Sequence, residues 1–457
     1  MDNKIKIKFL GASGTVTGSK FYLEHDKTRL LIDCGMFQGL KELRLHNWEN
    51  LPVDVSSIDY VLVTHGHLDH TGYLPRLVQQ GFQGSIIATA PSLAIAEIIL
   101  KDTAKIQEEE AENANKENYT KHSPALPLYT LKDVDKTIEL FENLEPETWK
   151  ELAPDVKFRF IKAGHIIGAC TIELSIQEKI FVFSGDLGRT EDILLEAPVK
   201  PTWADYLFLE STYGNKLHPS EKIDKILSNL IHEVIEKRSI LLIASFAVER
   251  LQLLVYLLWR LFKQNKAPEI PVFIDSPMGI NATHVFTNFP NYHKIPPHEF
   301  EAMKNRFELV SSFKRTWEII DLKIPRIVIA GSGMITGGRI LTYLKQFIDH
   351  ASTRLLLTGY QAEGTRGRQL EDGVHEIKIY GKYFPVKAKI TKLESLSAHA
   401  DQNELLDWCR NIKNIPEEVY LIHGEKNVID AFRVKLISEF NWHIYTPKLY
   451  EEIEIHL

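Results

Sequence analysis

Apolar and polar residues alternate with a period of two in the first part of the chain, as in half-buried β-strands. KIKIKFLGA (4–12) alternates in this way, and KFYLEHDKTRLLIDCG (20–35) predicts two strands joined at a polar turn. IDYVLV (58–63) is mostly apolar and predicts a strand covered on both faces. A second hairpin is expected between 156 and 186, in VKFRFIKAGH and CTIELSIQEKIFVFSGD. These patterns predict a β-rich layer over the first 80 residues and a second β-rich segment after the helices that follow.

Helical patterns separate these strands. LPRLVQQG (74–81) predicts a short helix that ends at Gly81, and 91–118 predicts a long helix whose charged second half is a solvated face. Thr130 and Asp133 have the spacing of a capping box, and Val134, Ile138 and Phe141 follow on one face. The sequence therefore predicts three helices between the first strands and the second hairpin.

The pattern changes near residue 206. Short, continuously apolar strands then alternate with helical segments, which predicts a parallel sheet flanked by helices; the strands are DYLFLEST (205–212), SILLIASF (239–246), IPVFIDSP (270–277), RIVIAGSG (326–333) and TRLLLTGY (353–360). After about residue 388, strands that end in histidines return. We therefore predict a first domain formed by 1–205 and 389–457, with a second α/β domain, 206–388, inserted into it.

Composition excludes several classes of protein. The chain has 457 residues, a formal net charge of −7 and three scattered cysteines, so a disulfide scaffold or a cysteine-based zinc site is not expected. The N-terminus has no signal-peptide core, and the longest apolar stretch, LQLLVYLLW (251–259), is too short to span a bilayer. We predict a cytoplasmic protein that does not act in a membrane. A local basic groove for nucleic acid is compatible with this charge.

Ionisable residues follow directly after apolar strands at several places. Ligand sites of layered α/β folds gather where strands end, so these side chains are expected to meet. The residues at strand ends are Asp33, His65, Asp186, Glu210 and His423, and His165 and His399 lie in loops of small residues.

The densest group is THGHLDH (64–70). His65 and His67 are two apart, so in an extended segment both imidazoles can reach one ion, whereas Asp69 and His70 would face a second. Imidazole with carboxylate and no thiolate suits catalytic zinc, with manganese or iron as alternatives. Two neighbouring cations need an anionic bridge, which Asp186 can supply.

On these residues the chain resembles the metallo-β-lactamase superfamily, and within it the β-CASP group of RNA-processing nucleases. HxHxDH after an Asp-ended strand (LLIDCG) carries the superfamily resemblance. The β-CASP resemblance covers nearly the whole chain and is carried by ESTYG (210–214), DSPMG (275–279), IAGSGMITGGR (329–339), GYQAEGTRGR (359–368), SAHAD (397–401) and HGE (423–425). It implies a metallo-β-lactamase αββα sandwich with an inserted α/β domain.

The resemblance also implies a site. His65, His67 and His165 would hold one zinc, and Asp69, His70 and His423 the other, with Asp186 and a hydroxide between the two ions. Asp33 would orient a ligand histidine. The implied activity is hydrolysis of phosphodiesters in RNA, with the bridging hydroxide as nucleophile. Single strands are the expected substrate, and an endonuclease is favoured over a 5′-exonuclease although no motif settles the mode of cutting. His399 would be the general acid, and Glu210 would keep it protonated.

Further residues are candidates for holding the RNA backbone. The glycine-rich loop GSGMITGGR lies between a strand and a helix, where backbone amides attract phosphate, although a tight turn without a ligand fits equally well. Arg366 and Arg368 add charge nearby. The candidates are Ser332, Gly333, Gly337, Gly338, Arg339 and Ser397.

One segment departs from the family pattern. SFAVERLQ (245–252) has Glu249 and Leu251 where the family suggests a glycine and a polar residue, and the extra charge could weaken RNA binding. Two other functions stay open: a small-molecule hydrolase such as a thioesterase or lactamase, and an inactive scaffold. The filled set of ligand positions argues against the scaffold. A homodimer is expected by resemblance alone.

Overall fold

The chain folds into two compact units, one of which is inserted into the other. The computed structural model describes residues 4–117, 123–359, 361 and 363–457. The first unit comprises Met1–Leu217 and His399–Leu457, and the second His218–Ala398. Each unit has its own sheets and its own apolar core.

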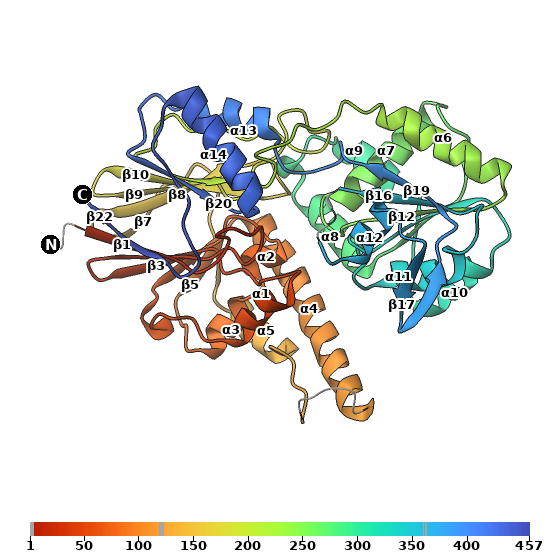
Figure 1. Ribbon diagram of the computed structural model, residues 1–457, viewed down its shortest axis with the longest axis horizontal. Helices are drawn as coiled ribbons and strands as arrows, with labels where there is room; N and C mark the ends of the chain where they lie inside the picture. The colour runs from red at the N-terminus through yellow and green to blue at the C-terminus, as the bar shows by residue number, and fades with distance from the viewer. Residues whose placement is uncertain (1–3, 118–122, 360, 362) are drawn as a thin grey trace. The chain divides into compact units, whose positions relative to one another are not determined.

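The first unit contains two seven-stranded sheets (Figure 1). In the first sheet, β1 is antiparallel to both of its neighbours, and β3 to β6 run parallel. Its strands, in spatial order, are β22 (Glu452–His456), β1 (Lys4–Phe9), β2 (Phe21–His25), β3 (Thr28–Ile32), β4 (Tyr60–Leu62), β5 (Ser85–Ala88) and β6 (Phe141–Asn143). β2 and β3 are antiparallel, with His25 paired to Thr28 across the polar turn, so the hairpin predicted in 20–35 is present.

The second sheet joins strands from three distant parts of the chain. β7 to β10 form an antiparallel meander, and β10, β11, β20 and β21 continue it in parallel. Its strands, in spatial order, are β21 (Ile444–Tyr445), β20 (Glu418–Ile422), β11 (Tyr206–Glu210), β10 (Lys179–Phe183), β9 (Cys170–Ile176), β8 (Val156–Lys162) and β7 (Lys150–Ala153).

The two sheets face each other across an aromatic core. In β1 the isoleucines and Phe9 are buried while the intervening lysines are partly exposed, as the period of two predicts. Phe9 meets Phe21 of β2 and Phe208 of β11, with ring centroids 6.1 Å apart in both pairs. The sequence alternation therefore decides which face of each strand enters the sandwich.

Helices cover the outer faces of the sandwich, which confirms the predicted αββα fold class. Figure 1 shows α3, α4 and α5 beneath the first sheet and α13 and α14 over the second. The capping box predicted at Thr130 and Asp133 is present at the start of α5. The helices of this unit are α1 (Lys41–Leu45), η1 (His46–Trp48), η2 (Val55–Ser57), α2 (Leu68–Thr71), α3 (Leu74–Gln79), α4 (Ala90–Glu117), α5 (Leu131–Ile138), α13 (Gln402–Cys409) and α14 (Lys426–Phe440).

The second unit is an α/β domain with an entirely parallel six-stranded sheet. Its strands, in spatial order, are β14 (Glu308–Leu309), β13 (Val272–Asp275), β15 (Arg326–Ala330), β12 (Ile240–Ala244), β16 (Arg354–Thr358) and β19 (Lys389–Leu393). Its helices are α6 (Ile223–Glu236), α7 (Arg250–Lys263), α8 (Pro277–Asn288), η3 (Pro290–Tyr292), α9 (Pro297–Lys304), α10 (Phe313–Asp321), α11 (Arg339–Phe347) and α12 (Arg366–Glu371). β17 (Glu376–Ile379) and β18 (Lys382–Pro385) form a separate hairpin.

The boundaries predicted after residues 205 and 388 need correction, because one strand at each boundary belongs to the other unit. β11 pairs with β10 and β20 in the first unit, although its sequence was assigned to the inserted domain. β19 pairs with β16 and so completes the sheet of the second unit. The inserted unit therefore begins and ends later in the chain than predicted.

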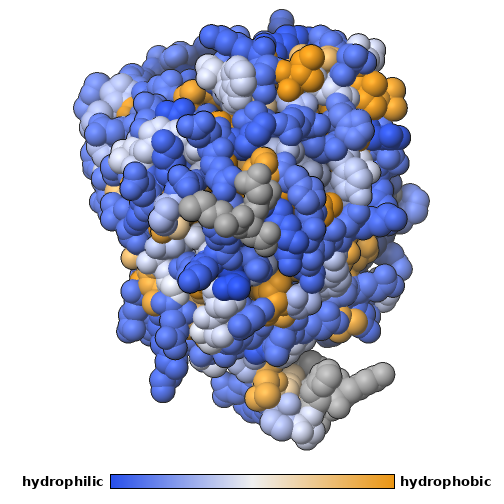
Figure 2. Space-filling view, turned by 90° about the vertical axis from the view of Figure 1, so that its left-hand side faces the viewer, coloured by the Kyte–Doolittle hydropathy of each residue, from blue (hydrophilic) through white to orange (hydrophobic). Residues whose placement is uncertain are grey.

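None of the helices in the described part of the chain is both long and apolar enough to cross a membrane. Figure 2 shows the face that carries the N-terminal strand as mainly hydrophilic, with apolar residues in small separate groups.

Candidate metal centre

Seven histidine and aspartate side chains converge at the ends of strands in the first unit. Two of them follow β4, and the next two lie in the short helix α2. One lies between β8 and β9, one follows β10 and one follows β20. They are His65, His67, Asp69, His70, His165, Asp186 and His423. All of the metal ligands predicted from the sequence are thus brought together, and their roles are proposed below.

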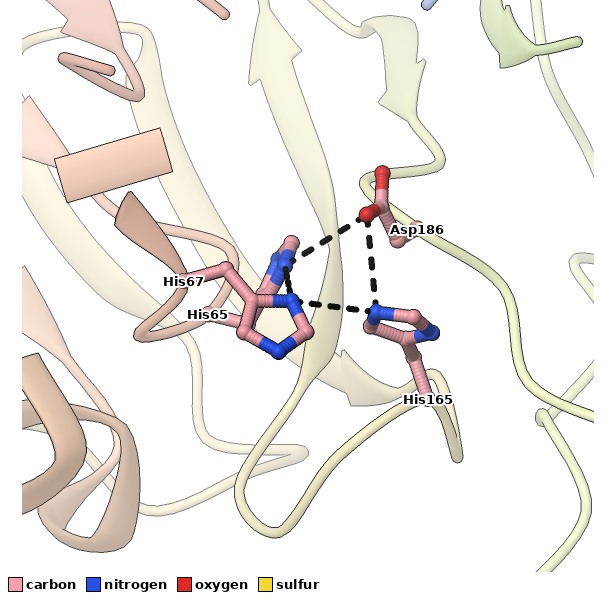
Figure 3. Close-up of side chains that lie close together, drawn as sticks. All are labelled: His65, His67, His165 and Asp186. Carbon is pink, nitrogen blue, oxygen red and sulfur yellow. Dashed lines mark hydrogen bonds and ion pairs between the residues drawn. The ribbon is translucent and has the colours of Figure 1, made fainter. Parts of the chain in front are cut away.

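The first group consists of three imidazoles and one carboxylate (Figure 3). His67 Nδ1 lies 3.1 Å from His65 Nε2 and 3.2 Å from His165 Nε2. Asp186 Oδ2 lies 3.5 Å from both His65 Nε2 and His165 Nε2. The ring nitrogens therefore point at a common space.

The second group lies on the other side of Asp186. His70 Nε2 and His423 Nε2 are 3.4 Å apart, and Asp69 Oδ2 is 4.0 Å and 3.5 Å from these two nitrogens. The second oxygen of Asp186, Oδ1, is 3.3 Å from His70 Nε2. One carboxylate therefore presents an oxygen to each group.

Asp33 contacts the side of the His70 ring that faces away from the cluster. Its Oδ2 lies 2.7 Å from His70 Nδ1, so it accepts the Nδ1–H and fixes the ring with Nε2 facing the cluster. Its Oδ1 accepts hydrogen bonds from the backbone N–H of Thr64, at 2.8 Å, and from the Thr64 hydroxyl, at 3.0 Å. A buried carboxylate with several donors is thereby fixed in position.

Close backbone packing positions the loops that carry these side chains. A Cβ on Gly35 would lie 1.5 Å from the carbonyl oxygen of Asp69, so only glycine fits beside the ligand turn. The amides of Ser19 and Cys34 donate to the carbonyls of Asp69 and His70 at 2.8 Å. The loops after β1 and β3 are therefore fastened to α2 through backbone hydrogen bonds.

Burial and neighbouring charges shift the pKa values of the cluster toward the protonation states that bind a cation. Burial lowers the pKa of His67 to about 4 and holds that of His65 well below its ordinary value, so both imidazoles are neutral at pH 7 and could donate a lone pair to a cation. Burial alone would raise the pKa of Asp186, but the surrounding His423, His70 and His65 outweigh it and hold the pKa well below the ordinary range. Asp186 is therefore ionised.

The donor set fits zinc. Four ligands at zinc–nitrogen distances of about 2.0–2.1 Å in a tetrahedron lie about 3.3 Å from one another. The nitrogen and oxygen contacts measured in the first group span 3.1–3.5 Å. Hydrogen bonds among the rings alone cannot satisfy every ring nitrogen at these distances. A single cation could accept a lone pair from each of them. Nitrogen and carboxylate oxygen without sulfur also suit manganese or iron.

His399 and Glu210 form a pair beside the cluster. His399 Nδ1 lies 3.4 Å from Glu210 Oε1, and its Nε2 lies 4.0 Å from Asp186 Oδ2. Burial would lower the pKa of His399, but the Glu210 carboxylate outweighs it and the pKa rises to about 8. The amide of Leu187 donates to Glu210 Oε1 at 2.6 Å and holds the carboxylate in place. A protonated imidazole at neutral pH therefore borders the candidate centre.

The residues predicted to hold RNA phosphates lie in the second unit, where many of their polar groups bond within the protein. The Ser332 hydroxyl accepts hydrogen bonds from the amides of Thr336, at 3.0 Å, and Gly337, at 3.2 Å. These backbone amides of the loop, which were expected to bind phosphate, are thus already bonded to a side chain. Arg339 lies 3.4 Å from Asp275. The other three are Gly333, which packs on Phe246, Gly338, which precedes α11, and Ser397, whose amide donates to Glu394.

The two arginines of GTRGR also contact the protein. Arg366 donates to the carbonyls of Lys378 at 2.6 Å and Thr336 at 3.1 Å, and Arg368 lies 2.9 Å from Asp372. Glu249 and Leu251 of the departing segment are buried, 3% and 1% exposed. Both side chains of this segment are therefore enclosed and not at the surface.

Sequence reasoning missed residues that support the ligands. The Thr64 hydroxyl lies 3.1 Å from His65 Nδ1, and the Thr212 hydroxyl lies 3.1 Å from His423 Nδ1. Thr64 directly precedes HxHxDH, and Thr212 lies within ESTYG. These positions were the sequence signal that could have identified the two threonines.

Comparison with known families agrees with this geometry. The model of the metallo-beta-lactamase superfamily matches residues 14–219, that of the Beta-Casp domain matches 251–370, and that of the Zn-dependent metallo-hydrolase RNA specificity domain matches 383–447. The chain belongs to the β-CASP group of the metallo-β-lactamase superfamily.

Among its relatives, a ribonuclease of Thermus thermophilus is 32% identical over 93% of this chain and 95% of its own length. An RNase J-like protein of Methanocaldococcus jannaschii is 31% identical over 92% of this chain and 93% of its own. The transcription termination factor FttA of the same archaeon is 29% identical over 99% of this chain and 72% of its own.

A crystal structure of a protein of unknown function from Enterococcus faecalis has a similar fold. It covers 99% of this chain and 100% of its own, with a TM-score of 0.56 and 11% sequence identity. This likeness concerns the fold alone.

Proposed function

We propose that the chain is a metal-dependent ribonuclease that hydrolyses phosphodiester bonds within single-stranded RNA. The observation that carries the proposal is the position of the His399–Glu210 pair next to a cluster of seven metal-type ligands. The names of two relatives, a ribonuclease and an RNase J-like protein, support RNA as the substrate. The match to an RNA specificity domain supports it further.

The two ligand groups would hold two zinc ions. His65, His67, His165 and Asp186 Oδ2 would hold one, and the other would be held by Asp69, His70, His423 and Asp186 Oδ1. Such ions lower the pKa of bound water and stabilise negative charge on a phosphate. Manganese or iron would satisfy the same ligands.

His399 would act as the general acid. Its pKa of about 8 keeps the imidazole protonated at pH 7, and Nε2 is the nitrogen nearer to Asp186. A proton from Nε2 would neutralise the departing 3′-oxygen as the P–O bond breaks. Glu210 would orient the ring through Nδ1 and stabilise its positive charge.

The central test replaces the acid and leaves the ligands. We expect His399→Ala to keep the metal content of the native chain and to lose about 10²- to 10⁴-fold in the rate of RNA cleavage, the usual contribution of a general acid. His443→Ala is the matched control, because this exposed histidine pairs with Glu418 away from the cluster. Metal content is measured by plasma emission spectrometry, with about two ions expected per chain.

The substrate panel decides between the functions. A circular single-stranded RNA has no ends, so its cleavage, with inhibition by a chelator, supports an endonuclease; cleavage of only the linear form supports a 5′-exonuclease. Turnover of a chromogenic lactam or thioester without RNA cleavage would overturn the proposal in favour of a small-molecule hydrolase. Duplex RNA and DNA test the preference for single-stranded RNA. A cytoplasmic location and a homodimer stay predictions.

A further inference from the structure

Two exposed aromatic rings stand on the hairpin formed by β17 and β18. Tyr380 and Tyr383 are 61% and 63% exposed, the highest exposures of any large aromatic side chain in the described residues. Tyr380 occupies the turn between the two strands, with φ at +47°. Figure 1 shows β17 at the periphery of the second unit. Neither ring contributes to the core of that unit.

The alternation along the hairpin leaves these rings outside. Ile377 and Ile379 of β17 are buried, 1% and 0% exposed, so the residues between them point outward. Lys378 pairs directly with Tyr383 in the antiparallel register, and its Nζ lies 5.6 Å from the centre of that ring. The outward face of the hairpin thus combines an ammonium group with an aromatic face.

The hairpin is basic in an acidic protein. Lys378, Lys382 and Lys387 are exposed, and Glu376 is the one acidic residue between 376 and 387. In the described residues, none of these three lysines forms an ion pair, whereas Lys389 and Lys392 just beyond them pair with Glu233 and Glu371. With a chain charge of −7, this local positive charge favours a polyanion.

The hairpin is also held firmly on its own unit. Arg366 donates to the carbonyl of Lys378 at 2.6 Å and to that of Thr336 at 3.1 Å, so it ties the hairpin to the loop before α11. The amide of Val386 donates to the carbonyl of His375 at 2.8 Å. Rings presented on a fixed hairpin lose little conformational freedom when a ligand binds.

We propose that the β17–β18 hairpin is a binding site for single-stranded RNA, in which bases stack on Tyr380 and Tyr383 and the neighbouring lysines contact the phosphates. Stacked bases on aromatic rings with lysines along the backbone are the usual means of binding single strands without sequence preference. A double helix keeps its bases stacked internally, so these rings select against it. The inference rests on the proposed ribonuclease function.

The test measures binding of a fluorescein-labelled uridine 12-mer to the full-length protein by fluorescence anisotropy, in a His399→Ala background with its metal retained. We expect Tyr380→Ala and Tyr383→Ala each to raise Kd about tenfold. Tyr380→Phe and Tyr383→Phe keep the rings and should retain most of the affinity. Lys378→Gln should reduce the slope of log affinity against log salt by about 0.7. Lys314→Gln, at a lysine 87% exposed on α10, is the matched charge control.

Three outcomes overturn the inference: an unchanged Kd in both alanine variants, an equal loss in the phenylalanine variants, or a change in sedimentation coefficient without a change in Kd. The last would make the hairpin an interface between copies of the chain. Cleavage of single-stranded RNA by the unmodified chain tests the proposed function separately. RNA cleavage combined with unchanged RNA binding in the variants sinks this inference alone, and absent RNA cleavage sinks the proposed function.

Discussion

At the scale of the residue, Lys20 shows how burial changes the chemistry of a side chain. It is 2% exposed, and its ammonium donates to the carbonyls of Gly35 at 2.6 Å and Gly18 at 3.1 Å. The same nitrogen lies 4.4 Å from the centre of the Phe37 ring. Burial lowers the pKa of Lys20 to about 8. This lysine joins the two loops that pack against α2.

Lys20 should therefore make stability depend on pH. Between pH 8 and the ordinary lysine value of about 10.4, the unfolded chain binds this proton and the folded chain does not, so folding becomes more favourable as pH rises. Below pH 8 both states bind the proton, so the dependence on pH ends and the buried ammonium lowers the free energy of unfolding by its full amount. We expect the free energy of unfolding of the native chain to rise by about 2 kcal/mol relative to Lys20→Met between pH 8 and pH 10.

Urea unfolding at the two pH values measures this difference. Lys20→Arg serves as a second reference, because a guanidinium keeps its charge throughout the range. A native-minus-Met difference that stays flat with pH, or falls, contradicts the assignment.

Residues of this kind mark the limit of sequence reasoning. The clustering of the candidate ligands was predictable: HxHxDH places three histidines and an aspartate in six residues, and Asp186 and His423 each follow an apolar strand. Lys20 begins a strand of alternating character and looks like a surface lysine. Its burial depends on Phe37 and on the Gly35 carbonyl, which only the folded loops bring to it.

At the scale of the element, strand character and the pairing of strands joined by a short turn were predictable, whereas the pairing of distant strands was not. The strands β11 and β12 are both continuously buried, and both are parallel to their neighbours on at least one side. Identical patterns therefore led to the same assignment, although β11 belongs to the first unit and β12 to the second. The pairing of β11 with β20, about 210 residues later, leaves no periodic signal in either strand.

The contact between the loop after β3 and α2 gives a prediction at this scale. In Gly35→Ala, the new methyl group would lie 1.5 Å from the carbonyl oxygen of Asp69, so α2 must move and take Asp69 and His70 with it. We expect a loss of about 1–3 kcal/mol in the free energy of unfolding, the usual cost of overpacking. Metal content should fall in the same variant.

Gly337→Ala is the matched control, since a Cβ there has no atom within 4 Å and lies in the other unit. Native stability combined with full metal content in Gly35→Ala would show that α2 does not depend on this close approach.

At the scale of the whole molecule, the insertion separates the candidate ligands in sequence without separating them in space. His65 and His423 are far apart along the chain, yet both lie in the first unit, because the second unit begins and ends within one connection between β11 and α13. The αββα class was predictable from the family resemblance that HxHxDH and the later motifs carry, whereas strand alternation alone predicted only a β-rich layer. The inserted unit was predictable from the change to continuous apolar strands.

Removal of metal should consequently loosen the first unit and leave the second unit unchanged. The candidate ligand segments 63–72, 163–169, 184–187 and 423–425 would share the proposed cations, whereas β12, β13 and β15 pack in their own sheet and core. We expect a chelator to speed amide hydrogen exchange about tenfold or more in the ligand segments, because bound metal stabilises only the conformation that gathers its ligands.

Peptides covering β12, β13 and β15 are the internal control in the same mass-spectrometric run. Readdition of zinc should restore protection in the ligand segments. Equal acceleration in both units, or none in the ligand segments, would mean that these side chains do not hold the ions.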